Sequence, residues 1–211
     1  MKFVLQRATG WSCPALIIAV VLILLLSILH HPAIATTVTE AGAVTEAGAT
    51  SEASPPPAVL RHLPDARLVG SARLSWFFFS LYDARLYAPP GFDRKTGPFA
   101  LQLTYLRDFS RNRLVDATLE ELRQQADPPD QSLQQDYRRI LDEIYPDIRK
   151  GDRLTAILNS QGRSLFFHNE KAIGSIDIPS FSRNFFAIWL GWQTRDPAFT
   201  RQLLGQSPAP G

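Results

Sequence analysis

The strand-like and helix-like segments of this chain are grouped instead of alternating, and this order limits the possible folds. The clearest strand covers residues 99–107, in which apolar and polar side chains alternate with period two. A β-rich stretch precedes it at residues 68–88, and helices, short strands and further helices follow it. The order favours an α+β fold with a large antiparallel sheet, because parallel sheets are built from strands and helices in alternation.

Two segments after the alternating strand have the spacing of amphipathic helices. Apolar residues recur on one face of residues 115–126 and again of residues 133–144, and each segment ends before a proline. Asp108 or Ser110 is the expected N-cap of the first helix. The remaining expected elements are strands at 153–158, 164–168 and 172–176, an aromatic helix that begins at Pro179, and a short helix near 201–205.

The stretch 68–88 is unusual because both of its faces are apolar. Because successive side chains of a strand point to opposite faces, the side chains at its centre form two sets, one on each face. This pattern predicts that the middle of the stretch is covered on both sides, and Pro89, Pro90 and Gly91 end it. One set contains Leu74, Trp76, Phe78, Ser80 and Tyr82, and the other contains Phe77, Phe79 and Leu81.

The N-terminal 35 residues have the organisation of a secretory signal peptide. Lys2 and Arg7 precede an apolar run at residues 15–29, and Ala33 to Ala35 form a small-x-small cleavage site. The run is shorter than the roughly 20 residues of a full membrane span, although an uncleaved anchor remains the alternative.

Four regions are therefore expected along the chain. Residues 1–35 are the signal peptide, and residues 36–58 are a disordered linker rich in Ala, Gly, Thr, Glu and Pro. Residues 59–206 form the folded domain, and residues 207–211 are a tail.

Charge and cysteine content exclude several classes of function. The chain has 22 Lys and Arg against 20 Asp and Glu, and removal of Lys2 and Arg7 leaves 20 of each sign. Nucleic-acid binding needs a basic excess, so no nucleic-acid partner is expected. Cys13 is the single cysteine and leaves with the signal peptide, which excludes disulfides and thiolate chemistry.

The familiar catalytic and cofactor signatures are missing. No Gly-rich phosphate loop, nucleophile elbow, zinc-binding helix or paired cysteine motif occurs, so neither a cofactor nor a metal is expected. Asp108 and Asp152 are conceivable bases, but each lies beside a turn or helix start, where capping is the commoner role.

One constellation of side chains has the chemistry of a binding cleft. The apolar face of residues 99–107 ends in the phenol of Tyr105 and the guanidinium of Arg107. Arginine pairs bidentately with carboxylates, and apolar clefts with a few polar groups at one end hold amphiphilic molecules. Trp76, Phe78 and Tyr82 are candidates for the wall of such a cleft. The alternative is that Arg107 lies at the solvent edge of the strand and pairs with a surface acid.

Several short motifs, taken together, resemble the bacterial chalcone-isomerase-like family over residues 60–205. The most specific is the segment 181–191, which ends Ile-Trp-Leu-Gly, followed by 201–205. The others are Tyr-Asp-Ala at 82–84, Tyr-Leu-Arg-Asp at 105–108 and Gly-Asp at 151–152. The resemblance implies an open-faced β-sandwich, in which a layer of helices covers one face of a large antiparallel sheet, and it implies a bacterial, periplasmic setting.

The plant isomerases of this superfamily close a flavanone ring with an arginine, a threonine and a tyrosine-lysine-asparagine set. In this sequence the position of the threonine aligns with about Phe77. The position of the arginine aligns near Pro64, and Arg67 is the nearest substitute. The third set falls around 111–115, where no tyrosine or lysine occurs. These departures argue against flavonoid isomerase activity.

Other members of the superfamily bind fatty acids, and an arginine and a tyrosine hold the carboxylate. Here the matching pairs are Tyr105 with Arg107, or Tyr82 with Arg67. The leading hypothesis is a secreted domain that binds a small amphiphile such as a fatty acid without turnover. The alternatives are an isomerase or intramolecular lyase acting on an enone, and a protein-interaction module without a pocket. Membrane contact is expected only through an uncleaved N-terminal segment.

Overall fold

The computed structural model describes residues 54–125, 127–192 and 194–206. The expected signal peptide, nearly all of the expected linker and the expected tail lie outside these residues. The folded part begins with a helix at Pro57, two residues before the predicted boundary. No helix within the described residues combines the length and the apolar character that a membrane crossing requires.

Six strands form one sheet in which every neighbouring pair is antiparallel, as the grouped order of the elements predicts. The strands lie side by side in their order along the chain. Each connection therefore joins adjacent strands, and helical segments precede the first strand, separate the third from the fourth and follow the sixth. The strands are β1 (Arg67–Trp76), β2 (Phe79–Ala88), β3 (Phe99–Tyr105), β4 (Arg153–Leu158), β5 (Ser164–His168) and β6 (Lys171–Ile176).

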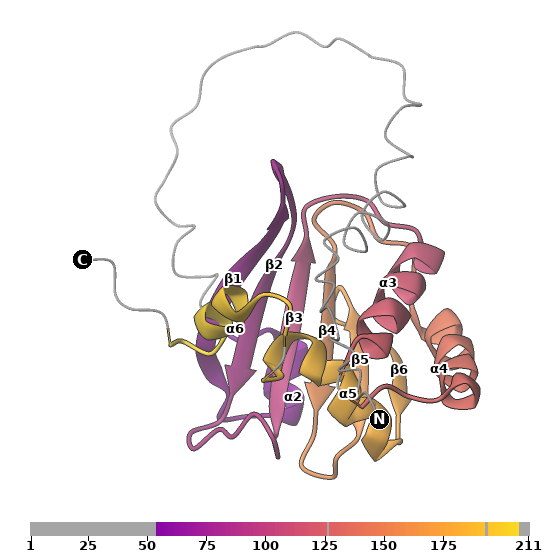
Figure 1. The fold of residues 1–211 in the computed structure, drawn as a ribbon. Coiled ribbons are helices and arrows are strands. Elements are labelled where there is room, and N and C mark those ends of the chain that lie inside the picture. Colours follow the sequence, from indigo (N-terminus) through magenta and orange to yellow (C-terminus); the bar gives the residue numbers. More distant parts are fainter. Residues whose placement is uncertain (1–53, 126, 193, 207–211) are drawn as a thin grey trace, which may run out of the picture. The chain divides into compact units, whose positions relative to one another are not determined.

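The helices cover the two faces of the sheet unequally. Figure 1 shows α3, α4 and α5 in front of the sheet, α6 across β1 and β2, and α2 behind the sheet. The predicted α+β fold with a helical layer is confirmed, and α2 adds a small cover on the opposite face. The helices are α2 (Pro57–His62), α3 (Arg111–Arg123), α4 (Gln131–Ile144), α5 (Pro179–Leu190) and α6 (Pro197–Leu203).

A side chain caps the N-terminus of α4 but not that of α3. The carboxylate of Asp130 accepts a hydrogen bond from the Leu133 amide and so caps α4. Ser110 is at the N-cap position of α3, but its side chain makes no capping bond. Asp108 instead accepts the Lys150 amide at 2.7 Å, which ties the end of β3 to the turn before β4. The predicted N-cap position of Ser110 is therefore confirmed, although its side chain does not cap the helix.

An aromatic core fills the space between the sheet and the main helical layer. Phe181 of α5 is fully buried, stacks on Phe185 at 5.4 Å between ring centroids and meets Tyr137 of α4 edge-on at 4.9 Å. Phe186 meets Phe99 of β3 at 4.8 Å. These aromatic side chains of α5 therefore pack into the core, and aromatic pairs of this geometry add about 0.5–1.5 kcal/mol beyond their buried area.

A second, smaller apolar cluster lies on the other face of the sheet. Ala58 and Val59 of α2 are fully buried there, against Tyr87, Ile157 and neighbouring side chains of the sheet. The Glu170 carboxylate accepts the Ala58 amide at 2.8 Å and so holds the first turn of α2 against the β5–β6 turn.

The centre of the 68–88 stretch differs from its prediction. β1 and β2 are two strands of a hairpin, joined by a two-residue loop at Phe77 and Phe78, and a register irregularity lies between Leu74 and Ser75. Phe77 is 77% exposed and Phe78 is 96% exposed. The prediction that the middle of this stretch is covered on both sides is wrong, because the chain reverses direction there.

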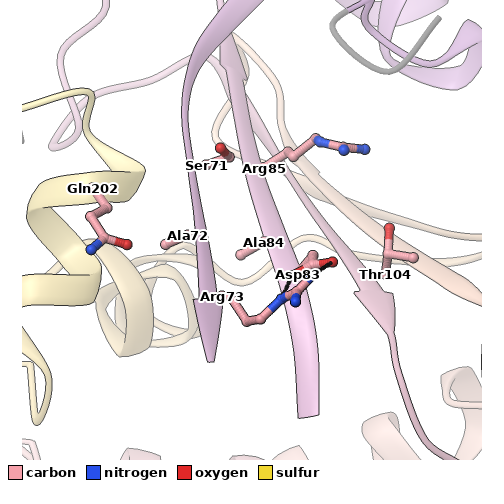
Figure 2. Close-up of a pocket in the computed structure, with 8 residues that line it drawn as sticks. All are labelled: Ser71, Ala72, Arg73, Asp83, Ala84, Arg85, Thr104 and Gln202. Atoms are coloured by element: carbon pink, nitrogen blue, oxygen red, sulfur yellow. Dashed lines mark hydrogen bonds and ion pairs between the residues drawn. The ribbon is translucent and has the colours of Figure 1, made fainter. Parts of the chain in front are cut away.

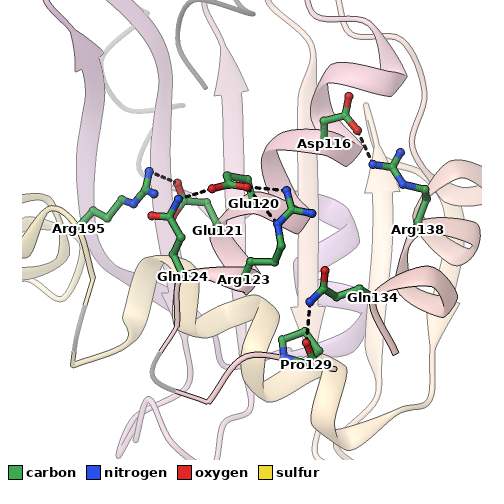
Figure 3. A network of polar contacts seen from close by, with 9 residues as sticks. All are labelled: Asp116, Glu120, Glu121, Arg123, Gln124, Pro129, Gln134, Arg138 and Arg195. Carbon is green, nitrogen blue, oxygen red and sulfur yellow. Dashed lines mark hydrogen bonds and ion pairs between the residues drawn. The ribbon is translucent and has the colours of Figure 1, made fainter. Parts of the chain in front are cut away.

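Polar contacts join the helices on their outer surface (Figure 3). Arg138 of α4 pairs with Asp116 of α3 at 2.5 Å, and Arg195, just before α6, pairs with Glu121 of α3 at 3.1 Å. Exposed pairs of this kind usually contribute less than about 1 kcal/mol, so the aromatic core is the main source of stability in this layer.

Candidate functional site

Two of the predicted site tyrosines lie side by side beneath the helical layer. Tyr82 of β2 and Tyr105 of β3 are directly opposite each other in the sheet register, and their ring centroids are 5.9 Å apart. Phe199 of α6 meets Tyr82 edge-on, and Phe109 meets Tyr105 at 5.5 Å. The two phenols therefore lie in an aromatic environment between the sheet and the helices.

The two hydroxyl groups differ in their hydrogen bonds. The indole Nε1 of Trp189 donates to the Tyr82 hydroxyl at 2.9 Å. Thr200 donates to the Trp189 carbonyl at 3.0 Å, so β2, α5 and α6 are linked through one polar chain. The Tyr105 hydroxyl has no hydrogen bond to any residue in the described ranges, although the residue is only 6% exposed. No completely buried side-chain polar atom in these ranges lacks a partner, so this hydroxyl keeps at least a slight exposure.

Burial keeps both phenols protonated at neutral pH. Desolvation raises the pKa of Tyr82, and the nearby Glu121 and Asp196 carboxylates raise it further. Desolvation also raises the pKa of Tyr105 well above its ordinary value, with smaller contributions from Tyr145 and Tyr82. Both hydroxyls are therefore neutral near pH 7 and have a proton to donate, and they are too weakly acidic to supply a phenolate.

These raised pKa values predict a loss of stability in alkali. When the pKa of a group is higher in the folded than in the unfolded state, the group stabilises the folded protein. Its full contribution is present below the unfolded pKa, which is near 10 for tyrosine, and is lost as the pH rises through the folded pKa. Burial also raises the pKa of Tyr145, to about 12. We expect the urea midpoint to fall steadily above about pH 10, and to fall less in Tyr145→Phe. A midpoint unchanged across that range, measured by circular dichroism, would contradict the burial of these phenols.

The guanidinium of Arg107 lies over an aromatic ring. Arg107 follows the end of β3 by two residues, and its Cζ is 4.4 Å from the ring centroid of Phe79 at the start of β2. No carboxylate within the described residues forms an ion pair with it, so the alternative of a surface salt bridge is not what the structure contains. The Leu106 amide donates to the Leu81 carbonyl at 2.9 Å and fixes this segment beside β2.

Two other predicted site residues lie elsewhere. Arg67 is exposed at the start of β1, where it pairs with Ala88, whereas Tyr82 pairs with Leu74 near the other end. Positions 67 and 74 of β1 are seven residue steps apart, a span of roughly 23 Å at about 3.3 Å per residue, so the structure does not bring Arg67 and Tyr82 together. Trp76 is half-buried at the end of β1 and contacts Phe77 edge-on at 4.5 Å.

A polar pocket of about 450 Å³ opens on the β1–β3 part of the sheet (Figure 2). Arg73 and Asp83 form an ion pair across β1 and β2 at its centre, at 2.5 Å. Sequence reasoning missed this pocket, although polar residues at alternate positions of β1 and β2 were its signal. The lining is too polar for an acyl chain. It consists of Ser71, Ala72, Arg73, Asp83, Ala84, Arg85, Thr104 and Gln202.

The two candidate bases have structural roles. Asp152 accepts hydrogen bonds from the Arg149 amide and the Asn169 side chain, both at 2.8 Å, and lies 3.2 Å from His168. The Arg149 amide contributes most to lowering the pKa of Asp152, followed by Asn169. Within the described ranges no group of three or more acidic, histidine or cysteine side chains is placed to hold a metal ion.

Comparison with known proteins identifies the family. The sequence profile described as chalcone isomerase-like matches residues 64–205, which is about two thirds of the chain. This chain belongs to the chalcone isomerase-like family. A search of curated protein sequences gave no match.

A solved structure resembles this chalcone isomerase-like domain in its fold. It is similar to the crystal structure of a fatty-acid binding protein of Arabidopsis thaliana, with a TM-score of 0.52 and 12% sequence identity. The alignment covers 67% of this chain and 87% of the plant protein. At this identity the match establishes a shared fold.

Proposed function

We propose that this chalcone isomerase-like domain binds a small amphiphile such as a fatty acid between its sheet and its helical layer, without turnover. The observation that carries the proposal is the pair of buried, neutral phenols of Tyr82 and Tyr105, of which the Tyr105 hydroxyl has no hydrogen-bond partner among the described residues. We also propose that the chain is secreted and acts in the periplasm, on the strength of its N-terminal sequence.

The polar groups suit a ligand with a negatively charged head. A carboxylate accepts hydrogen bonds, and the Tyr105 hydroxyl donates one without giving up an existing bond. Among the described residues, the ring of Phe79 is the partner found for the Arg107 guanidinium, which leaves its N–H groups available for a charge-assisted pair. Phe109 and Phe199 supply apolar surface beside the two phenols. The fold shared with a fatty-acid binding protein supports the same ligand class.

The test begins with the chain expressed in full in a bacterium and purified. Native mass spectrometry, followed by solvent extraction, identifies any amphiphile that co-purifies. A stoichiometric fatty acid or related lipid supports the proposal. An apo mass together with no binding in a fatty-acid titration overturns it and favours an interaction module. Turnover of an enone that is lost in Tyr105→Phe overturns it in favour of an isomerase.

Substitution of Arg107 tests the assignment of the carboxylate partner. We expect Arg107→Ala to weaken fatty-acid binding roughly 10- to 100-fold, because a hydrogen bond to a charged group contributes about 1.5–3 kcal/mol. Arg67→Ala is the matched control, since it removes an exposed guanidinium from the far end of β1 and leaves the affinity unchanged. Calorimetric titration measures both. Equal affinities for Arg107→Ala and the unmodified chain would exclude Arg107 as the anchor.

A further inference from the structure

The β1–β2 hairpin ends in an aromatic tip, defined here as residues 76–79, Trp-Phe-Phe-Phe. Phe78 is 96% exposed, Phe77 is 77% exposed, and Phe79 is 36% exposed. Within the described residues, three of the six exposed large apolar side chains therefore belong to four consecutive positions. Scattered apolar side chains are ordinary on a protein surface, but such a concentration indicates an interaction site.

The backbone conformation at Phe77 of the tip is unfavourable for phenylalanine. Phe77 has a φ of 51°, in the left-handed region that favours glycine. Two-residue hairpin loops normally place Gly, Asn or Asp at such a position. Strain held at an exposed position, where no packing requires a phenyl ring, indicates that the exposed ring itself has a role.

Polar groups lie immediately behind the aromatic tip. The hydroxyls of Ser75 and Ser80 are hydrogen bonded at 3.0 Å, two residues behind the loop on each strand. At about 3.3 Å per residue this pair lies roughly 7 Å from the loop. The Arg73–Asp83 ion pair follows further along the same strands. The hairpin is thus apolar at its tip and polar immediately behind it.

We propose that the aromatic tip inserts into the interfacial region of a lipid bilayer. The roughly 7 Å of apolar hairpin fits the depth of about 5–10 Å to which interfacial segments bury their apolar faces. Aromatic side chains favour this region, and the Arg107 guanidinium, held over the ring of Phe79, is placed to meet lipid phosphates.

The size of the tip favours lipid over a protein partner. A buried aromatic side chain covers about 150–250 Å², so the rings of Phe77 and Phe78 offer roughly 300–500 Å². A stable protein interface needs about 800 Å² on each partner. The proposal does not require the proposed ligand site, because the exposed rings and the strained loop carry it, and Arg107 adds to it only through its position over Phe79. If both proposals hold, the domain takes up its ligand at a lipid bilayer, in which amphiphiles are dissolved.

An environment-sensitive fluorophore on the tip provides the test. The full chain carries Cys13→Ser, so that a new cysteine is its single thiol, and the dye is attached through Phe78→Cys. The control is Ser160→Cys, at the exposed turn between β4 and β5, on the opposite end of the sheet. Vesicles of phosphatidylethanolamine and phosphatidylglycerol, with and without nitroxide-labelled lipid, are added to each.

We expect the dye at position 78 to shift to the blue and to be quenched several-fold more strongly by the nitroxide lipid than the dye at position 160. The N-terminal apolar run is the same in both proteins, so any attachment through it is equal and the difference reports on the tip. Phe77→Gly removes a ring while relieving the backbone strain, so it keeps the fold and is expected to reduce the shift at position 78.

Two results overturn the proposal. Equal emission from the two positions on vesicles means that the tip stays in water. A blue shift that grows with protein concentration before any lipid is added means that a second copy of the chain covers the tip.

Discussion

Replacement of Phe181 by alanine is expected to lower the free energy of unfolding by about 3–5 kcal/mol, which is the usual cost of removing a buried phenyl ring from a core. Phe181 is fully buried, and its ring contacts Tyr137, Phe166 and Phe185, which come from α4, β5 and α5. Three elements lose packing at once, and the surrounding rings are too large to close the cavity. Urea unfolding followed by circular dichroism measures the change.

The aromatic tip provides a matched control for this prediction. Phe78→Ala removes the same ring from a position that is 96% exposed. We expect its effect on unfolding to stay within about 0.5 kcal/mol, as for surface substitutions away from special features. Comparable losses for Phe181→Ala and Phe78→Ala would mean that the aromatic core is not organised around α5 as described.

The sequence predicts most elements because their patterns are local. Residues 99–105 alternate as expected, and the structure pairs them on both sides with β2 and β4. The spacing at 133–144 matches α4, in which Tyr137, Leu141 and Ile144 are buried. In each case one periodic pattern extends over a whole element, and the apolar face that the pattern defines packs against the core.

The β1–β2 hairpin was missed because its loop carries none of the usual turn residues. Glycine, asparagine, aspartate and proline identify turns in a sequence, whereas Phe77 and Phe78 have the composition of a strand. The reversal is fixed instead by the pairing of Arg67–Trp76 with Phe79–Ala88 along their full length. The stabilisation comes from that pairing and offsets the strained φ of Phe77.

The contacts of the candidate site were beyond sequence reasoning for a different reason. Tyr82 and Trp189 are 107 residues apart in the chain, and only the docking of α5 on the sheet brings the indole to the phenol. The pairing of Tyr82 with Tyr105 likewise depends on the register between β2 and β3. Residue types therefore suggested the site, and the topology determined which of them meet.

Replacement of Gly70 by alanine is expected to loosen α6 and to lower the free energy of unfolding by about 3 kcal/mol, the upper end of the usual cost of overpacking. A Cβ on Gly70 would lie 2.6 Å from the Leu203 carbonyl oxygen and 2.6 Å from the Gly205 amide nitrogen. Both atoms belong to the backbone, so no side chain can rotate away, and the end of α6 has to move off β1. Hydrogen exchange is expected to rise in residues 197–205 before it rises in the sheet.

Gly174→Ala is the control, because it adds the same methyl group to another strand glycine. There the new Cβ meets the Ile144 side chain at 2.7 Å, and this side chain can adjust. We expect a smaller loss of stability and no change in hydrogen exchange of α6. Since Phe199 of α6 covers Tyr82, Gly70→Ala should also weaken fatty-acid binding, whereas Gly174→Ala should not. Unchanged protection of α6 in Gly70→Ala would mean that the helix does not depend on this close approach.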